Sequence, residues 1–344
     1  MAFETACYKC GKEAVYKRRV SGENLCRKCF LKSFSEKIVK TISRYKMFER
    51  NDSIAVAFSG GRDSATLLHV LVKIEKKFPE SEIIALFIDE GIEKYRQNCH
   101  EIVEENCKKL GVELVTSSLK ELFGITIDEI INQRENLIAT TPKKHLTVYS
   151  ACAYCGILRR KAINLVAREK IQADKIALAH NLDDEAQTIL LNILRADIER
   201  IAREYRHTAR TNPLLVPRVK PFRETPGREI ALYAYYKEIN YHYTECPYAQ
   251  EAMREDLKKY LAEMEQKRPG TLYNIIRSGE TIAKALQKYP KTTKTLKTCQ
   301  KCGEPSAKKT CKACETIQQY TAANTQKQQQ QIQTEIKLPK REET

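Results

Sequence analysis

The sequence has no tryptophan, only 9 phenylalanines and no run of about 20 consecutive apolar residues, so it carries no pattern for a membrane span. The opening residues MAFETACYKC lack the basic and then apolar segments of a secretory signal. We therefore expect a cytoplasmic, reducing environment without membrane association. Hydrophobic residues still make up 42% of the 344 residues, which is enough for a sizeable core.

Acidic residues are scarce near both ends of the chain. Residues 1–50 hold 13 Lys+Arg against 5 Asp+Glu, and residues 284–314 hold 9 against 1. The rest of the chain balances, so the net charge of +16 belongs to these two segments. Two basic ends around a neutral body favour two contacts with a polyanion such as RNA, whereas the alternative is a pair of solvated lysine-rich faces.

Thirteen cysteines are unusual in a reducing compartment, where metal binding or catalysis is more common than disulfide formation. Eight of them form two CxxC pairs near each end: Cys7, Cys10, Cys26 and Cys29; Cys299, Cys302, Cys311 and Cys314. Four thiolates close a tetrahedron around Zn²⁺ and leave no open position, so each set predicts a structural zinc site. The alternative is a chance grouping of cysteines in basic segments.

The middle of the chain alternates strand and helix patterns. Short apolar runs predict buried strands at 53–58, 82–89, 112–117 and 174–180. This alternation indicates an α/β fold with a doubly wound parallel sheet. Four prolines make Asn212–Arg228 an expected extended connection. Further helices are expected at Arg228–Ile239, Tyr248–Lys267 and Leu272–Lys288.

A glycine-rich turn follows the first predicted strand and opens a helix. Its residues are Ser59, Gly60, Gly61, Arg62, Asp63 and Ser64. In this position, glycine N–H groups, two hydroxyls and the helix N-terminus suit a phosphate group. The segment lacks the spacing and the Lys-Ser/Thr end of a Walker A motif. Asp63 beside a polyphosphate fits a helix cap or a Mg²⁺ partner, and the alternative for the whole segment is an ordinary turn.

Three further cysteines are not needed by the terminal sets. Cys152 and Cys155 stand in SACAYCGILRR, and Cys246 stands in TECPYA. Three thiolates leave one position open, which favours a [4Fe-4S] cluster with one iron free or, alternatively, a catalytic persulfide pair. Cys99 and Cys107 match neither pattern and are expected to be core or surface thiols.

These motifs together carry a family resemblance. SGGRDS resembles the signature of PP-loop ATP pyrophosphatases, which cleave ATP to AMP and pyrophosphate while adenylating a substrate oxygen. CxxCGxxRR, HNLDDEAQT at 180–188 and ECPY, all between two four-cysteine modules, resemble the TtuA and NcsA group of tRNA 2-thiouridine synthetases. The resemblance covers about residues 1–316. It implies a fold of the PP-loop (adenine nucleotide alpha hydrolase-like) type, flanked by N- and C-terminal zinc modules.

The expected domain organisation follows from these motifs. We predict an N-terminal zinc finger at 1–32, a catalytic domain with C-terminal helices at 33–295, and a second zinc finger at 296–317. The Gln-rich remainder, 318–344, is predicted to be disordered.

The resemblance also implies roles for individual residues. The residues implied to bind nucleotide are Ala57, Ser59, Gly60, Gly61, Asp63, Ser64, Ile88, Arg159 and Ala179, of which Ala57, Ile88 and Ala179 would contact adenosine. Cys152, Cys155 and Cys246 would ligate the cluster. Asp183 matches a catalytic acidic residue, although taken alone it fits a helix N-cap equally well. Arg159 falls where the family often has a catalytic lysine, and arginine keeps the charge and can clamp phosphates.

The implied activity is ATP-dependent tRNA 2-thiolation: the C2 oxygen of a uridine is adenylated and replaced by sulfur, with the wobble position favoured. The implied cofactors are ATP, Mg²⁺, a [4Fe-4S] cluster and two structural Zn²⁺ ions. Expected partners are tRNA, a ubiquitin-like protein with a C-terminal thiocarboxylate or another sulfide source, and a second copy in a homodimer. The alternatives are thiolation of the T-loop uridine at position 54, a cluster-free persulfide thiolase, and a non-enzymatic zinc-ribbon RNA-binding protein.

Overall fold

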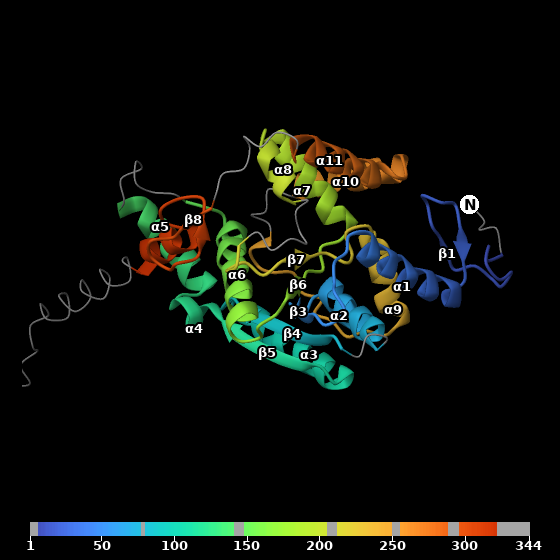
Figure 1. Cartoon of the computed structure of the whole chain (residues 1–344), viewed down its shortest axis with the longest axis horizontal. Helices are drawn as coiled ribbons and strands as arrows, with labels where there is room; N and C mark the ends of the chain where they lie inside the picture. The colour runs from blue at the N-terminus through green and yellow to red at the C-terminus, as the bar shows by residue number, and fades with distance from the viewer. Residues whose placement is uncertain are drawn as a thin grey trace, which may run out of the picture.

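A parallel sheet forms the centre of the computed structural model, which describes residues 6–76, 80–140, 148–204, 212–249, 255–287 and 296–321 (Figure 1). Its strands within these ranges are β3 (Ser53–Ala57), β4 (Glu82–Asp89), β5 (Glu113–Ser118), β6 (Lys175–Ala177) and β7 (Arg218–Val219). Their order is β5-β4-β3-β6-β7, and every pairing is parallel. The prediction of an α/β fold with a parallel sheet is confirmed.

The edge strand β7 lies within the proline-rich segment that was expected to be only an extended connection. It pairs with β6: the Ile176 N–H donates to the Pro217 carbonyl and the Leu178 N–H to the Val219 carbonyl, both at 2.8 Å. A two-residue strand between Pro217 and Pro221 is too short to leave an apolar run in the sequence. The extended backbone at Arg218–Val219 was therefore predicted, whereas its pairing with β6 was missed.

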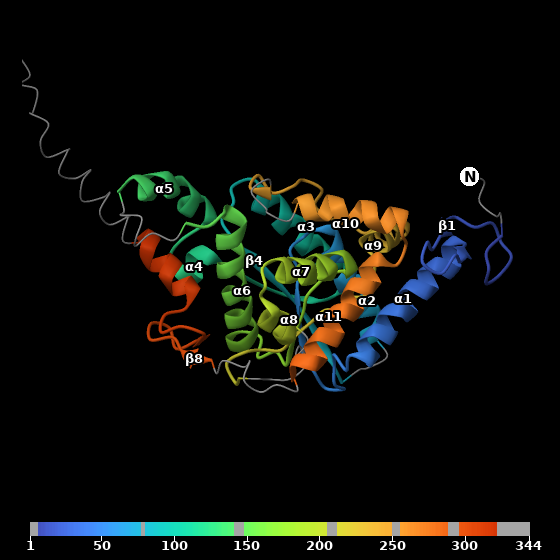
Figure 2. The same cartoon turned by 90° about the horizontal axis from the view of Figure 1, so that it is seen from above.

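Helices cover both faces of the sheet, as Figure 2 shows. One face carries α1 (Arg27–Arg44), α2 (Arg62–Glu75), α3 (Tyr95–Leu110) and α9 (Gly227–Tyr236). The other carries α4 (Leu119–Phe123), α5 (Ile127–Thr140) and α6 (Ala151–Glu169). Successive residues of a strand point to opposite faces of the sheet. Val56 therefore packs with the first group of helices and Ala55 with the second.

A further group of helices lies beyond the edge of the sheet that β7 forms (Figure 1). It contains α7 (Leu182–Leu194), α8 (Ile198–Glu204), α10 (Glu255–Lys267) and α11 (Thr271–Gln287). Its small core includes Leu182, Leu261 and Ile276. None of the helices in the described ranges has the length and apolar character of a membrane span.

The helix predicted from Tyr248 begins later within the described residues, at Glu255. Tyr248 lies in a turn, and residues 250–254 are outside the description. The backbone carbonyl of Tyr248 accepts a hydrogen bond from Cys152 Sγ at 3.4 Å, and its hydroxyl donates to Asp128 at 2.8 Å. These two contacts hold Tyr248 in the turn, so the predicted helix start was wrong.

Small cysteine modules lie at the two ends of the long axis (Figures 1 and 2). The N-terminal cysteine module, residues 7–31, contains the hairpin of β1 (Tyr16–Lys17) and β2 (Asn24–Leu25) and runs directly into α1, which crosses the expected boundary after residue 32. The C-terminal cysteine module, residues 296–316, contains the hairpin of β8 (Lys297–Thr298) and β9 (Pro305–Ser306).

The N-terminal cysteine module is fixed to α9 through a buried carboxylate. Glu229, in the first turn of α9, has a side chain that is only 1% exposed. Arg18 Nε lies 2.9 Å from its Oε1, and Lys37 Nζ on α1 lies 3.6 Å from its Oε2. Burial, assisted by the Glu229 charge, raises the pKa of Tyr16 to about 12. Module, α1 and α9 are therefore tied together by one ion-pair cluster.

The C-terminal cysteine module packs against α6. Arg168 on α6 forms an ion pair with Glu304 of the module at 2.5 Å. A helix over 312–321 follows, and the hydroxyl of its buried Tyr320 donates to that of Tyr154 on α6 at 3.0 Å. Residues 318–321, expected in the disordered tail, thus belong to the folded part, because Tyr320 fills the core beside α6. The remainder of that expected tail, 322–344, lies outside the described residues.

Removal of Arg18 should loosen the N-terminal cysteine module. Arg18→Met leaves Glu229 buried beside a single, more distant cation, which should cost about 3 kcal/mol. We expect hydrogen exchange over residues 7–31 to accelerate roughly a hundredfold, with Arg19→Met as the matched control because Arg19 is exposed. Equal exchange in the two variants would show that the ion pair does not hold the module.

Candidate active site and metal centres

The candidate site lies where the strand order of the sheet reverses. From β3 the chain proceeds to β4 and β5 on one side, and then returns to β6 on the other side of β3. The carboxyl ends of β3 and β6 therefore lie at the point of the sheet beside which ligands bind in open α/β folds. Ala57, Ile88 and Ala179 lie at or just beyond the carboxyl ends of β3, β4 and β6.

The glycine-rich turn joins β3 to α2 in a shape that fits an anion. Gly60 has φ +85°, and a Cβ there would lie 3.1 Å from the Cys99 carbonyl oxygen. Ser64 Oγ accepts a hydrogen bond from the Ser59 N–H at 3.2 Å and lies 3.1 Å from Ser59 Oγ. Gly61 caps α2 without a side-chain hydrogen bond, so the first N–H groups of the helix are available to a phosphate.

Two aspartates from different elements meet around Asn181. Asn181 Nδ2 donates to Asp63 Oδ2 at 2.8 Å, and the Gly227 N–H donates to Asp183 Oδ2 at 2.8 Å. A Cβ on Gly227 would lie 3.3 Å from Asn181 Nδ2 and 3.5 Å from Asp183 Oδ2, so these groups are close neighbours. Asn181 caps α7 in a capping box with Asp184. The helix-cap interpretation of Asp183 is therefore excluded.

A buried carboxylate joins the glycine-rich turn to Arg159. Glu90, fully buried directly after β4, forms ion pairs with Arg96 through Oε2 and with Arg159 through Oε1, the latter at 3.3 Å. Arg96 Nη1 also donates to the Ser59 carbonyl at 3.0 Å. The Arg159 side chain is 45% exposed, whereas that of Arg96 is 5% exposed. Arg96 is thus the fixed cation and Arg159 the one that reaches solvent.

Glu90 and Arg96 were missed at the sequence level. The available signal was a second acidic residue directly after a strand, in the position where parallel sheets place their site residues. The sequence gives no reason to prefer Glu90 over its neighbour Asp89, because only burial distinguishes the two.

The three central cysteines come from two segments that contact each other. Cys152 and Cys155 lie in the first turns of α6, and Cys246 lies in the loop that leads to Tyr248. The same loop contacts the glycine-rich turn, because the His242 N–H donates to the Gly60 carbonyl at 2.9 Å. Burial raises the pKa of Cys155 to about 11, and the Cys246 charge adds to this effect. Cys99 and Cys107 are buried on α3, as expected for core thiols.

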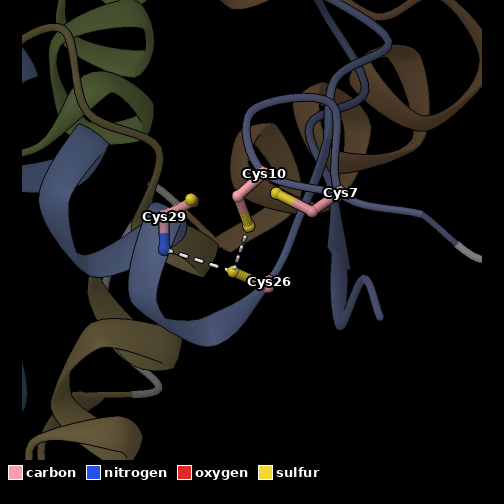
Figure 3. A group of neighbouring side chains, drawn as sticks. All are labelled: Cys7, Cys10, Cys26 and Cys29. Atoms are coloured by element: carbon pink, nitrogen blue, oxygen red, sulfur yellow. Dashed lines mark hydrogen bonds between the residues drawn. The ribbon is translucent and has the colours of Figure 1, made fainter. Parts of the chain in front are cut away.

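The terminal cysteines form two compact sets. Within the described residues, the sulfur atoms of each set lie within 4.8 Å of one another. Figure 3 shows Cys7, Cys10, Cys26 and Cys29 with their sulfur atoms turned toward a common centre. The Cys26 N–H and further backbone donors lower the pKa of Cys7 to about 6. Such an arrangement suits a tetrahedral metal ion. The described cysteines outside these two sets, including Cys152, Cys155 and Cys246, do not meet this spacing.

Comparison with known proteins agrees with this geometry. A family profile described as a PP-loop domain matches residues 31–135, and one described as the N-terminal LIM domain of 2-thiouridine synthetase TtuA matches residues 7–31. Cytoplasmic tRNA 2-thiolation protein 1 of Chlamydomonas reinhardtii is 37% identical over 299 residues, which cover 86% of this chain and 80% of the relative. The protein of the same name from Danio rerio is 35% identical over 301 residues, covering 86% and 83%.

A solved structure extends the likeness to three dimensions. The U34-tRNA thiolase NcsA from Methanococcus maripaludis, determined with its [4Fe-4S] cluster, superimposes with a TM-score of 0.77 at 31% identity. The match covers 92% of this chain and 96% of NcsA. The predicted resemblance is thereby confirmed: the chain belongs to the family of PP-loop tRNA thiolation proteins that includes NcsA and cytoplasmic tRNA 2-thiolation protein 1.

Proposed function

We propose that this protein is an ATP-dependent tRNA 2-thiouridine synthetase acting on the wobble uridine. The observation that carries the proposal concerns the loop from His242 to Tyr248, which contains Cys246. This loop contacts both the glycine-rich turn and α6. The loop reaches the glycine-rich turn through His242 and Gly60, and α6 through Cys152 and Tyr248. One loop therefore connects the glycine-rich turn to the segments that carry the three thiols, which supports a reaction that couples ATP cleavage to sulfur transfer.

The first task of the site is to activate a poor leaving group. Uridine C2 is a weak electrophile, and its oxygen must be adenylated before it can leave as AMP. Ser59, Gly61 and the N-terminal N–H groups of α2 would hold the ATP phosphates. The adenosine would lie against Ala57, Ile88 and Ala179.

Two groups in the site could offset the negative charge of the departing pyrophosphate: a Mg²⁺ ion held by carboxylates, and an arginine. Asp63 and Asp183 offer carboxylate oxygens on either side of Asn181, and they would hold Mg²⁺ as hard oxygen ligands. Arg159 keeps its positive charge at any pH relevant here and is oriented by Glu90. Its exposed guanidinium would offset charge on the phosphates as the bond to AMP forms.

The three central thiols, two on α6 and one in the loop that contacts it, would hold a [4Fe-4S] cluster with one open position. Such a cluster would supply an iron with an open coordination position at which a sulfur donor could bind. The solved structure of NcsA, which contains a [4Fe-4S] cluster, favours the cluster over the persulfide alternative.

The terminal modules would bind structural zinc and contribute to tRNA binding. Exposed lysines of the two modules include Lys9, Lys12, Lys301 and Lys309, and the two modules lie at opposite ends of the molecule (Figure 1). A tRNA spanning the sheet domain would meet basic residues at both ends.

We also propose the domain boundaries given above, a thiocarboxylate or other sulfide donor, a homodimer, and the cytoplasmic location that the names of relatives state.

The cluster ligands can be tested one at a time. Cys152→Ala, Cys155→Ala and Cys246→Ala should each abolish thiolation and the iron–sulfur absorbance while sparing zinc, because each removes one of three anchors. Anaerobically purified protein should hold iron and sulfide in a cubane ratio. Cys107→Ala, a buried thiol of α3, is the matched control. Full activity in any of the first three variants would refute the three-ligand site.

The glycine-rich turn can be tested at Gly60. Gly60→Ala places a methyl group 3.1 Å from the Cys99 carbonyl at φ +85°, so the turn must move and ATP affinity should fall about tenfold or more. Gly111→Ala is the matched control, since it has φ +67° but open space around the added carbon. Titration with ATP measures the effect, and equal affinities in the two variants would contradict this role of the turn.

Metal removal should unfold the two ends of the molecule and leave the central sheet protected. A zinc chelator should remove hydrogen-exchange protection over 7–31 and 296–316, because the small hairpins there bury little apolar surface without the metal. The strands β3 to β6 should stay protected by their own core. Identical protease resistance with and without chelator would rule out structural metal in the modules.

A further inference from the structure

A lysine of α6 points into the C-terminal cysteine module. Lys161 Nζ lies 2.9 Å from Cys302 Sγ, 3.6 Å from Cys314 Sγ and 3.9 Å from Cys311 Sγ. Below it, the ring of Phe123 on α4 has its centroid 5.8 Å from Nζ. The ammonium group therefore occupies a defined place between an aromatic ring and three sulfur atoms.

The charge of the module explains why a cation is favourable there. Four thiolates and one Zn²⁺ sum to −2, and the sulfur-bearing residues Cys299 and Cys314 are buried. Hydrogen bonds from an ammonium group stabilise such sulfur atoms and reduce the charge that must be buried against α6. The donor comes from the helix that carries the cluster ligands, not from the module itself.

The position of Lys161 on α6 connects the module to the active site. Lys161 is two positions after Arg159, which places the two side chains about 200° apart around the helix. Arg159 accordingly meets Glu90, whereas Lys161 meets the module. The Arg168 ion pair with Glu304 adds a second attachment two turns further along α6.

We propose that Lys161 is the charge-compensating hydrogen-bond donor of the C-terminal zinc site and that through it the module positions α6, with Arg159 and Cys155, beside the phosphate site. Lys161 is a positioning residue, because it contacts the metal ligands and not the reacting atoms. The part that concerns Arg159 and Cys155 rests on the function proposed above, whereas the zinc-site part does not.

The test compares full-length variants that hold both zinc ions. Lys161→Met should release the second zinc to a chromogenic chelator about tenfold faster than wild type. Exchange should rise over 296–316 and the second half of α6 but not over 7–31, and kcat for tRNA-dependent pyrophosphate release should fall with the KM for ATP unchanged. Lys161→Arg, which keeps the charge and the donor, should release zinc, exchange and turn over as wild type does. Lys301→Met, which removes an exposed lysine of the same module, is the control for zinc release and hydrogen exchange alone, and both rates should equal those of wild type.

Three results would overturn the proposal. Zinc release at the wild-type rate in Lys161→Met would remove the donor role. Faster release with unchanged exchange in α6 would remove the positioning role. If Lys161→Met does not fold, Lys161→Gln keeps an N–H donor without the charge, and release as slow as in Lys161→Arg would exclude charge compensation. Zinc release and hydrogen exchange need no active thiolase, so these results fail or succeed independently of the proposed function.

Discussion

The structure depends on the position of β3 in the middle of a parallel sheet. Because β3 pairs with β4 on one side and β6 on the other, the chain must reverse direction across it, and the carboxyl ends of all strands meet at one edge. That edge brings together Gly60, Glu90 and Asp183, which are separated by many residues in the sequence. A reaction that needs phosphates, two carboxylates and an arginine in one place can be built only where such segments converge.

Each terminal module forms an ion pair with a helix that borders this edge, α9 for the N-terminal module and α6 for the C-terminal one. Arg18 of the N-terminal module binds Glu229, two residues after the Gly227 amide that holds Asp183. At the other end, Lys161 and Arg168 attach the C-terminal module to α6, the helix that carries Cys152 and Cys155. Each module therefore contacts an element that carries part of the site. A role in tRNA binding and a role in holding the site rigid are compatible, because the first uses exposed lysines and the second uses buried ion pairs.

Much of this arrangement was predictable from the sequence, and the remainder depends on contacts that leave no local pattern. Long apolar runs such as Glu82–Asp89 predicted their strands, and the regular CxxC spacing predicted both modules. The two residues of β7 are too few to show a period. The burial of Glu90, which turns an ordinary acidic residue into the link between Arg96 and Arg159, exists only after folding. Asp183 is not the N-cap of α7, because Asn181 holds that position, and the sequence alone does not distinguish the two.

In the proposed reaction, this site couples ATP cleavage to sulfur insertion into a tRNA uridine. Position-resolved mass spectrometry of tRNA nucleosides from cells lacking the protein tests it most directly, with the cells complemented by wild type or by Cys155→Ala. We predict that 2-thiouridine disappears from the wobble position, returns with wild type and stays absent with Cys155→Ala. An unchanged wobble nucleoside in cells lacking the protein, or its full return with Cys155→Ala, would contradict the account.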